Sequence, residues 1–186
     1  MRRACAEPAF HISVLDIDET GLIEVISASQ NRPATPGLSC QSGDVLLSCI
    51  NPRIWRVAVV PSLPGSWTCS CEFIVLRPKR GVNPWGLAVA LHNESVLRTV
   101  KFMAGGTSSS RQRVPKDLVL QVHVTPRLDN SPTLVEHAQS RELFYRTRLC
   151  EFRAYERLHQ GALEFDLAYV SRESASAAIP FHVQAR

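Results

Sequence analysis

The sequence of 186 residues lacks any apolar run that approaches the ~20 residues needed to cross a bilayer core. Arg2 and Arg3 resemble the basic start of an export signal, but residues 5–8 supply no apolar segment behind them. The chain is also too apolar for long disorder, since 45% of its residues are hydrophobic and 20% are charged. We therefore expect a globular cytoplasmic protein, of about one domain with an appendage, that has no membrane partner.

Patterns typical of metal and disulfide sites are missing too. The six cysteines form no Cys-x-x-Cys pair, and none has a histidine at zinc-finger spacing. Cys69 and Cys71 stand two residues apart in an apparent strand, so they share a face and are poorly placed to bridge each other. Without an export signal, we expect buried free thiols and predict no metal or cofactor site.

The net charge of +4 is unevenly distributed along the chain. Residues 51–127 carry 11 Lys and Arg against 3 Asp and Glu, whereas the segments on either side are slightly acidic. A basic middle third is typical of a surface that binds a polyanion. The alternative is a set of ordinary solvated cations on several faces, and charge alone does not separate the two.

Short elements are predicted as far as residue 124. We expect strands at 10–17, 22–26, 44–50, 57–60, 68–77 and 118–124, with a long surface loop over 27–42. Asn83-Pro84 predicts a helix that reaches about Leu91, and a second helix follows from Asn93 or Glu94 to Met103. These elements favour an α+β fold with a mixed, twisted β-sheet and packed short helices.

Residues 133–160 contain no Gly or Pro and predict one long helix. Such a helix of ~28 residues spans about 42 Å, which exceeds what a small domain needs to cover its core. We therefore expect it to contact something beyond its own domain, through an apolar face that includes Tyr145, Leu149, Phe152 and Tyr155. The predicted domains are residues 1–130, a long helix over 131–168, and an unassigned tail over 169–186.

An acidic segment follows the first predicted strand. Asp16-Ile17-Asp18-Glu19-Thr20 is similar to the first motif of haloacid-dehalogenase-type phosphatases, in which one Asp attacks phosphorus and a second acts as acid and base beside magnesium. Such a site needs further carboxylates and a Lys, but the later Asp residues form no acidic pair. A structural cluster where a strand meets a turn is the simpler interpretation.

Two other segments suit contacts with nucleic acid. Residues 105–113 (GGTSSSRQR) combine small residues, hydroxyls and two arginines, which can bind phosphate, and Arg and Gln can also read base edges. Residues 51–56 (NPRIWR) place amide, guanidinium and indole groups between two strands. The alternatives are a flexible polar loop for the first segment, and a tight turn with Trp55 in the core for the second.

Four segments in order resemble the target recognition domain of type I restriction–modification specificity subunits. They are GDVLLSCINPRIWRVAVVP (43–61), CEFIVLRPK (71–79), NPWGLAVAL (83–91) and GGTSSSRQRVPKDL (105–118), and FHISVLDID (10–18) resembles the opening strand of that domain. The resemblance covers about residues 10–127. The chain departs from the family at 125–129 (TPRLD), where a Pro-Pro-Leu-x-x-Gln-type segment usually enters the spacer helix. The 186 residues also resemble one recognition domain and not two, so we expect a half-subunit that pairs with itself, a fragment, or a related domain of another system.

The resemblance implies sequence-specific recognition of double-stranded DNA without catalysis. The domain would direct an adenine methyltransferase, and in a full complex a motor restriction subunit, while the long helix serves as a spacer or as a surface for self-pairing. The predicted DNA-binding residues are Asn51, Arg53, Arg56, Thr107, Ser108, Ser109, Ser110, Arg111, Gln112, Arg113 and Lys116. Two alternatives stay open, namely a magnesium-dependent phosphatase that uses Asp16 and Asp18, and a structural interaction subunit.

Overall fold

The computed structural model describes residues 9–105, 112–124 and 131–175, with side chains up to residue 160. Contacts within the chain divide it into two units, Met1–Arg148 and Leu149–Arg186. The first unit holds all the described strands and short helices, together with the start of the long helix. The second unit continues that helix.

The strands of the first unit form two three-stranded sheets. One sheet has the order β1-β5-β2, in which β1 (Ala9–Ile12) is parallel to β5 (Ser66–Cys69), and β2 (Leu38–Cys40) is antiparallel to β5. The other has the order β4-β3-β6 and is antiparallel throughout, with β4 at Val57–Val59, β3 at Val45–Ser48 and β6 at Phe73–Leu76. The predicted mixed α+β architecture is confirmed, with its strands divided between two sheets.

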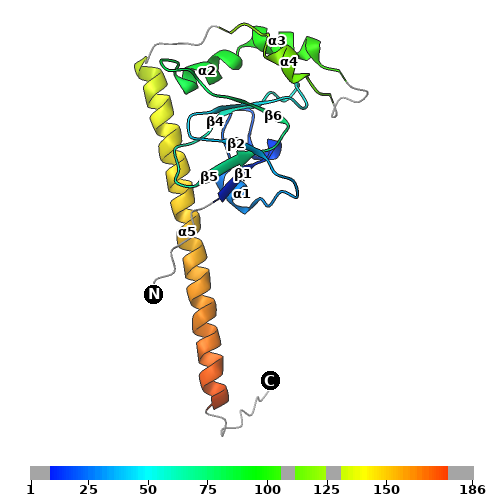
Figure 1. Cartoon of the computed structure of the whole chain (residues 1–186). Coiled ribbons are helices and arrows are strands. Elements are labelled where there is room, and N and C mark those ends of the chain that lie inside the picture. The colour runs from blue at the N-terminus through cyan, green and yellow to red at the C-terminus, as the bar shows by residue number, and fades with distance from the viewer. Residues whose placement is uncertain (1–8, 106–111, 125–130, 176–186) are drawn as a thin grey trace, which may run out of the picture. The chain divides into compact units, whose positions relative to one another are not determined.

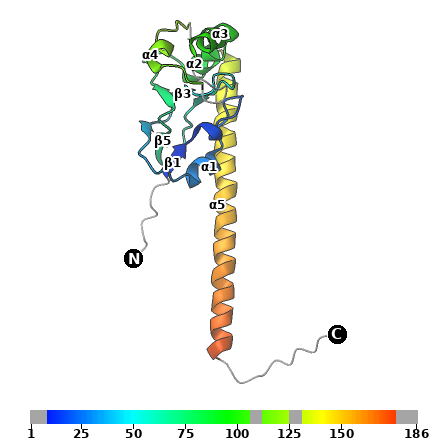
Figure 2. The same cartoon turned by 90° about the vertical axis from the view of Figure 1, so that its right-hand side faces the viewer.

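Three short helices lie at one end of this unit, as both views show (Figures 1 and 2). They are α2 (Pro84–Leu91), α3 (Glu94–Met103) and α4 (Lys116–Val119), whereas β1, β5 and α1 (Val25–Gln30) lie toward the other end. All four residues of β3 are buried, because sheet partners flank it and the helices cover its face. The main core joins this sheet to the helices through Val45, Leu47, Trp55, Val57, Val59, Ile74, Ala88, Leu91, Val96, Val100, Val114 and Val119.

Both predicted helix starts are confirmed. The Asn83 side chain accepts hydrogen bonds from the backbone N–H groups of Trp85 (2.9 Å) and Gly86 (3.3 Å), and Pro84 occupies the first helical position. The Asn93 side chain likewise accepts from Ser95 N at 2.9 Å. The sequence indicates these boundaries correctly because N-caps and N1 prolines act locally.

Three predicted strands are wrong in extent or type. Residues 118–124 do not form a strand, since Pro115 introduces the single helical turn of α4 and Leu120 N donates to Lys116 O at 3.1 Å. Residues 22–26 pair only at Ile23, with Ile17, before α1 begins. The first strand stops at Ile12 and is followed by a 3₁₀ turn at Val14–Asp16.

The predicted strand over 68–77 is two strands that belong to different sheets. The chain turns at Ser70, whose carbonyl accepts from Phe73 N at 3.1 Å. The apolar and polar residues alternate on both sides of this turn, so their periodicity does not reveal the break. Cys69 is buried in β5, whereas Cys71 is exposed in the turn and not on the same strand face. Cys40 and Cys49 are also buried and free, as expected, and burial raises the pKa of the Cys49 thiol to about 11.

The long helix α5 runs from Pro132 to Ala175 and includes the predicted residues 133–160. Its start belongs to the first unit, where Glu142 accepts from Ser62 N (2.9 Å to Oε2) and His137 meets Trp85 edge-on at 5.4 Å between ring centroids. Tyr145 is fully buried there, and its hydroxyl accepts a hydrogen bond from Ile23 N at 3.1 Å. No described helix is long and apolar enough to cross a membrane.

Candidate nucleic-acid interface

An ion pair between an exposed guanidinium and a buried carboxylate connects two of the segments singled out in the sequence. Gly43 (φ +83°) leads into β3, and the following Asp44 is 1% exposed. Arg77, just after β6, donates through Nε to Asp44 Oδ1 (2.9 Å) and through Nη2 to Oδ2 (2.8 Å). Such a two-pronged contact fixes the relative position of both strands, because guanidinium and carboxylate planes match.

The turn after β3 carries the first group of predicted DNA-binding residues. Asn51 has a φ of +49°, and its carbonyl accepts from Ile54 N at 3.0 Å. Asn tolerates this left-handed conformation better than most residues other than Gly. Its Oδ1 is buried and has no hydrogen-bond partner among the described residues, while Arg53 is exposed at the tip of the turn.

The second group begins beside this turn. Asn51 N donates to Gln112 O at 2.9 Å, and Val114 N donates to Cys49 O at 2.9 Å, so the two segments run antiparallel. Gly105 and Arg113 exchange backbone hydrogen bonds of 3.1 and 2.9 Å, which closes the base of the 105–113 loop. Thr107, Ser108, Ser109, Ser110 and Arg111 lie outside the described residues.

Arg113 is held by a partner that sequence reasoning missed. Its Nη2 lies 2.6 Å from Glu72 Oε1, its Nε donates to Oε2 at 3.2 Å, and 59% of the Arg113 side chain stays exposed. The hydrogen bond from Arg113 lowers the pKa of Glu72, which keeps this carboxylate ionised. Glu72 is one of only three acidic residues among the 11 cations of residues 51–127, so the sequence could have marked it as a candidate ion-pair partner.

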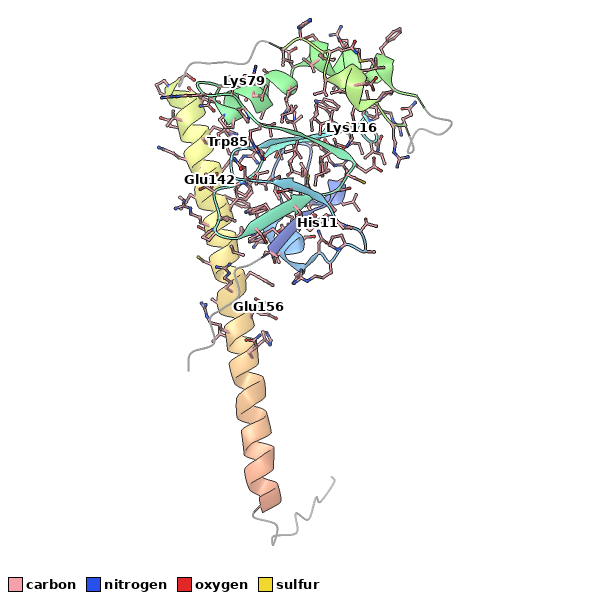
Figure 3. All side chains as sticks on the ribbon, in the orientation of Figure 1. His11, Lys79, Trp85, Lys116, Glu142 and Glu156 are labelled. Atoms are coloured by element: carbon pink, nitrogen blue, oxygen red, sulfur yellow. The ribbon has the colours of Figure 1, made fainter. Side chains whose placement is uncertain are left out.

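Two other predicted DNA-binding cations have structural partners. Lys116 Nζ donates to the carbonyls of Cys71 (2.6 Å) and Phe73 (2.8 Å) and so ties α4 to the β5–β6 turn. Arg56 Nε donates to Ile17 O at 2.8 Å. Lys116 contacts the start of β6 and Lys79 follows its end, so these two cations of the middle third lie apart (Figure 3).

Trp55 is a core residue. Its side chain is 6% exposed, and its indole Nε1 donates to Leu91 O at 2.9 Å. The sequence left open whether 51–56 contacts nucleic acid or is a tight turn with Trp55 in the core. For the second half of this segment, the tight turn with Trp55 in the core is correct. The structure brings Asn51 next to Gln112 and Arg113, with Arg53 exposed in the same turn as Asn51. It assigns Arg56 and Lys116 to bonds within the fold and pairs Arg113 with Glu72.

The acidic segment at 16–20 is a structural cluster. Asp16 is 6% exposed and accepts from Ser13 N (2.6 Å), Ser27 Oγ (2.5 Å) and Asn31 Nδ2 (2.7 Å). Partial burial favours the neutral form of Asp18, but hydrogen bonds from Leu22 and Thr20 outweigh it and lower the pKa of this carboxyl. Within the described part of the chain, no three His, Cys, Asp or Glu residues are grouped to hold a metal ion. The phosphatase alternative thus finds no support.

The residues predicted for a helix interface differ in exposure. Tyr145 and Leu149 are buried within the chain, Phe152 is half-buried, and Tyr155 is 60% exposed. Tyr145 packs against its own domain, so its contribution is to hold the start of α5 in place. Leu158, 73% exposed, lies one helical turn after Tyr155.

No family model and no curated protein matches the chain. Among solved structures, one from a study of the complex assembly and conformational transition of the type I restriction–modification (R-M) system matches 96% of this chain and 45% of its own, with 20% identity and a TM-score of 0.50. The HsdS subunit from Thermoanaerobacter tengcongensis matches 93% of this chain and 46% of its own, with 19% identity and a TM-score of 0.48. The chain thus spans less than half the length of either structure. The fold implied by the sequence resemblance is confirmed: the chain has the fold of a chain from a type I restriction–modification system.

Proposed function

We propose that the chain is a non-catalytic, sequence-specific DNA-binding module of a restriction–modification system. The observation that carries this proposal is the backbone pairing of Ile50 and Asn51 with Gln112 and Arg113. It joins the turn that carries the exposed Arg53 to the end of the 105–113 segment. The shared fold with a chain of the type I system supports the same assignment.

The side chains at this end suit the chemistry of a DNA duplex. Asn and Gln can make two hydrogen bonds to an adenine edge, and Arg can do the same with guanine or bind phosphate. The orphaned Oδ1 of Asn51 is an acceptor for which the fold supplies no donor among the described residues. Because this oxygen is buried, an adenine N6 amino group reaches it only when the turn opens, whereas the exposed Arg53 is directly accessible.

The partners follow from this role. The module would position an adenine methyltransferase, and in a full complex a motor restriction subunit, in the cytoplasm. We assign partner contacts on α5 to the exposed Tyr155 and Leu158, with the half-buried Phe152 beside them, and we include self-pairing of two copies among these contacts.

DNA binding is tested with the full chain and a fluorescent library of random duplexes, titrated at several salt concentrations. Log affinity should fall linearly with log salt, because bound arginines release counterions from phosphate. Arg53→Ala should weaken binding by about 1–3 kcal/mol if it reads a base, with relaxed preference in the selected sequences. Arg32→Ala, an equal change of charge at an exposed residue between α1 and β2, is the matched control and should bind as the wild type. Binding without salt dependence, or equal losses in both variants, contradicts the proposal.

Self-pairing is tested by light scattering. The wild-type chain should show the mass of a dimer, and Leu158→Glu should shift it toward the monomer because a charge replaces an exposed leucine in the pairing face. Leu15→Glu places the same charge on another leucine that is 87% exposed and should leave the mass unchanged. A monomeric wild type rules out self-pairing and leaves the DNA proposal intact.

A further inference from the structure

Phe102 presents its ring almost entirely to solvent. It is 94% exposed in the last turn of α3, whereas Val96 and Val100 on the inner side of the same helix are buried. A phenylalanine in this position contributes almost no apolar burial to the fold. Single exposed apolar residues are ordinary on a protein surface, so a binding role for Phe102 has to be argued from its location.

The location is next to the proposed DNA-binding residues. Phe102 stands three residues before Gly105, which is backbone-paired with Arg113. Three residues of chain span at most about 11 Å, and paired strands are about 5 Å apart, so the Cα atoms of Phe102 and Arg113 are within roughly 16 Å. A ring there lies within a few base pairs of a duplex bound by Arg113.

Two exposed neighbours of Phe102 on α3 are cationic. Lys101 precedes it, and no carboxylate in the described ranges forms an ion pair with Lys101. Arg98 lies one turn earlier and pairs with Glu94 at 3.5 Å, with 77% and 75% of the two side chains exposed. Exposed pairs of this kind are weak, so Arg98 can exchange its carboxylate for a phosphate.

We propose that Phe102 is a further DNA contact, whose ring packs against the bases while Lys101 and Arg98 bind the flanking phosphates. Phenylalanine makes such contacts with thymine methyl groups and with unstacked base steps. This inference rests on the proposed DNA-binding function and adds an apolar contact from a third segment, α3. An anionic partner is favoured over a protein surface because Lys101 and Arg98 lie close to the ring on the same helix.

The test compares Phe102→Ala with Leu15→Ala in the full chain, using the random duplex library and then the duplex selected from it. Leu15 is 87% exposed and lies on the 3₁₀ turn after β1, so both variants remove an exposed apolar side chain without disturbing the core. Phe102→Ala should weaken binding about 10-fold, as expected for loss of one base–aromatic contact. Its salt dependence should stay that of the wild type, whereas Lys101→Ala should reduce the slope by about one. Leu15→Ala should bind normally.

Each outcome separates the two proposals. If the wild-type chain binds with salt dependence and Phe102→Ala binds equally well, the Phe102 inference is overturned and the proposed function stands. Normal DNA binding combined with loss of a co-purifying protein would also overturn it, since the ring would then be a protein contact. If the wild type itself shows no salt-dependent binding, both proposals fail.

Discussion

Replacing Tyr145 by phenylalanine tests how the first unit holds the start of α5. The Tyr145 hydroxyl accepts from Ile23 N at 3.1 Å, and the side chain is 0% exposed. Removing only the oxygen leaves the Ile23 N–H buried without an acceptor, which costs about 1–3 kcal/mol of unfolding free energy. Removing the ring as well, in Tyr145→Ala, adds the cost of a cavity and should bring the total to about 3–5 kcal/mol.

The assay is chemical denaturation of the full chain, followed by circular dichroism. Tyr155→Phe is the matched control, because the same oxygen is removed from a tyrosine that is 60% exposed on the same helix. That variant should change the unfolding free energy by less than about 0.5 kcal/mol. The slope against denaturant should be unchanged in all variants, since the surface exposed on unfolding is the same.

The reasoning is refuted if Tyr145→Phe and Tyr155→Phe are equally stable. That result would mean that Tyr145 does not anchor the helix to its own domain. Burial raises the pKa of the Tyr145 phenol, so its hydroxyl stays protonated and its stabilising contact should be constant from pH 6 to about 9.

Three further predictions address the acidic groups and the turn. Asp16→Asn should lower the unfolding free energy by about 1–3 kcal/mol, because three donors face the Asp16 carboxylate. A phosphate-ester assay with magnesium should show no activity in either the wild type or this variant. Activity that is present in the wild type and lost on substitution would restore the phosphatase alternative. The stabilisation from Glu72 with Arg113 should be complete above pH 4.5 and disappear as the pH falls through the lowered pKa of Glu72, a dependence that acid titration should find absent in Glu72→Gln. Asn51→Gly should change the unfolding free energy by less than about 0.5 kcal/mol, since glycine accepts a φ of +49°. The same substitution should weaken duplex binding by about 1–3 kcal/mol. A variant that binds DNA normally would show that Asn51 is not part of the interface.

The sequence predicted best what local chemistry decides. Asn83 and Asn93 start their helices as N-caps, and the short apolar runs that include 45–48 and 57–59 mark strands whose side chains enter the core. It predicted poorly where the deciding contact is distant. The break at Ser70 depends on strands that belong to different sheets, and Lys116 ties α4 to the carbonyls of Cys71 and Phe73, which are more than 40 residues away.

The candidate site shows the same division. Composition singled out the segments 51–56 and 105–113, but it did not show which of their cations are bonded within the fold and which are available to DNA. Arg56 and Lys116 donate to backbone carbonyls far along the chain, and Trp55 reaches Leu91, so these side chains serve the fold. The pairing of Arg113 with Glu72 spans 41 residues and has no periodic signature.

The frame that carries the candidate DNA-reading residues consists of main-chain bonds. Asn51 N to Gln112 O, Val114 N to Cys49 O, and the exchange between Gly105 and Arg113 all use groups that almost any amino acid provides. Side chains at positions 53 and 112 can therefore be replaced without removing a bond that positions the segments, whereas position 51, with φ +49°, favours Asn or Gly. Under the proposed function, a new target sequence is then reachable through single substitutions in a folded protein, which would separate the evolution of specificity from the maintenance of stability.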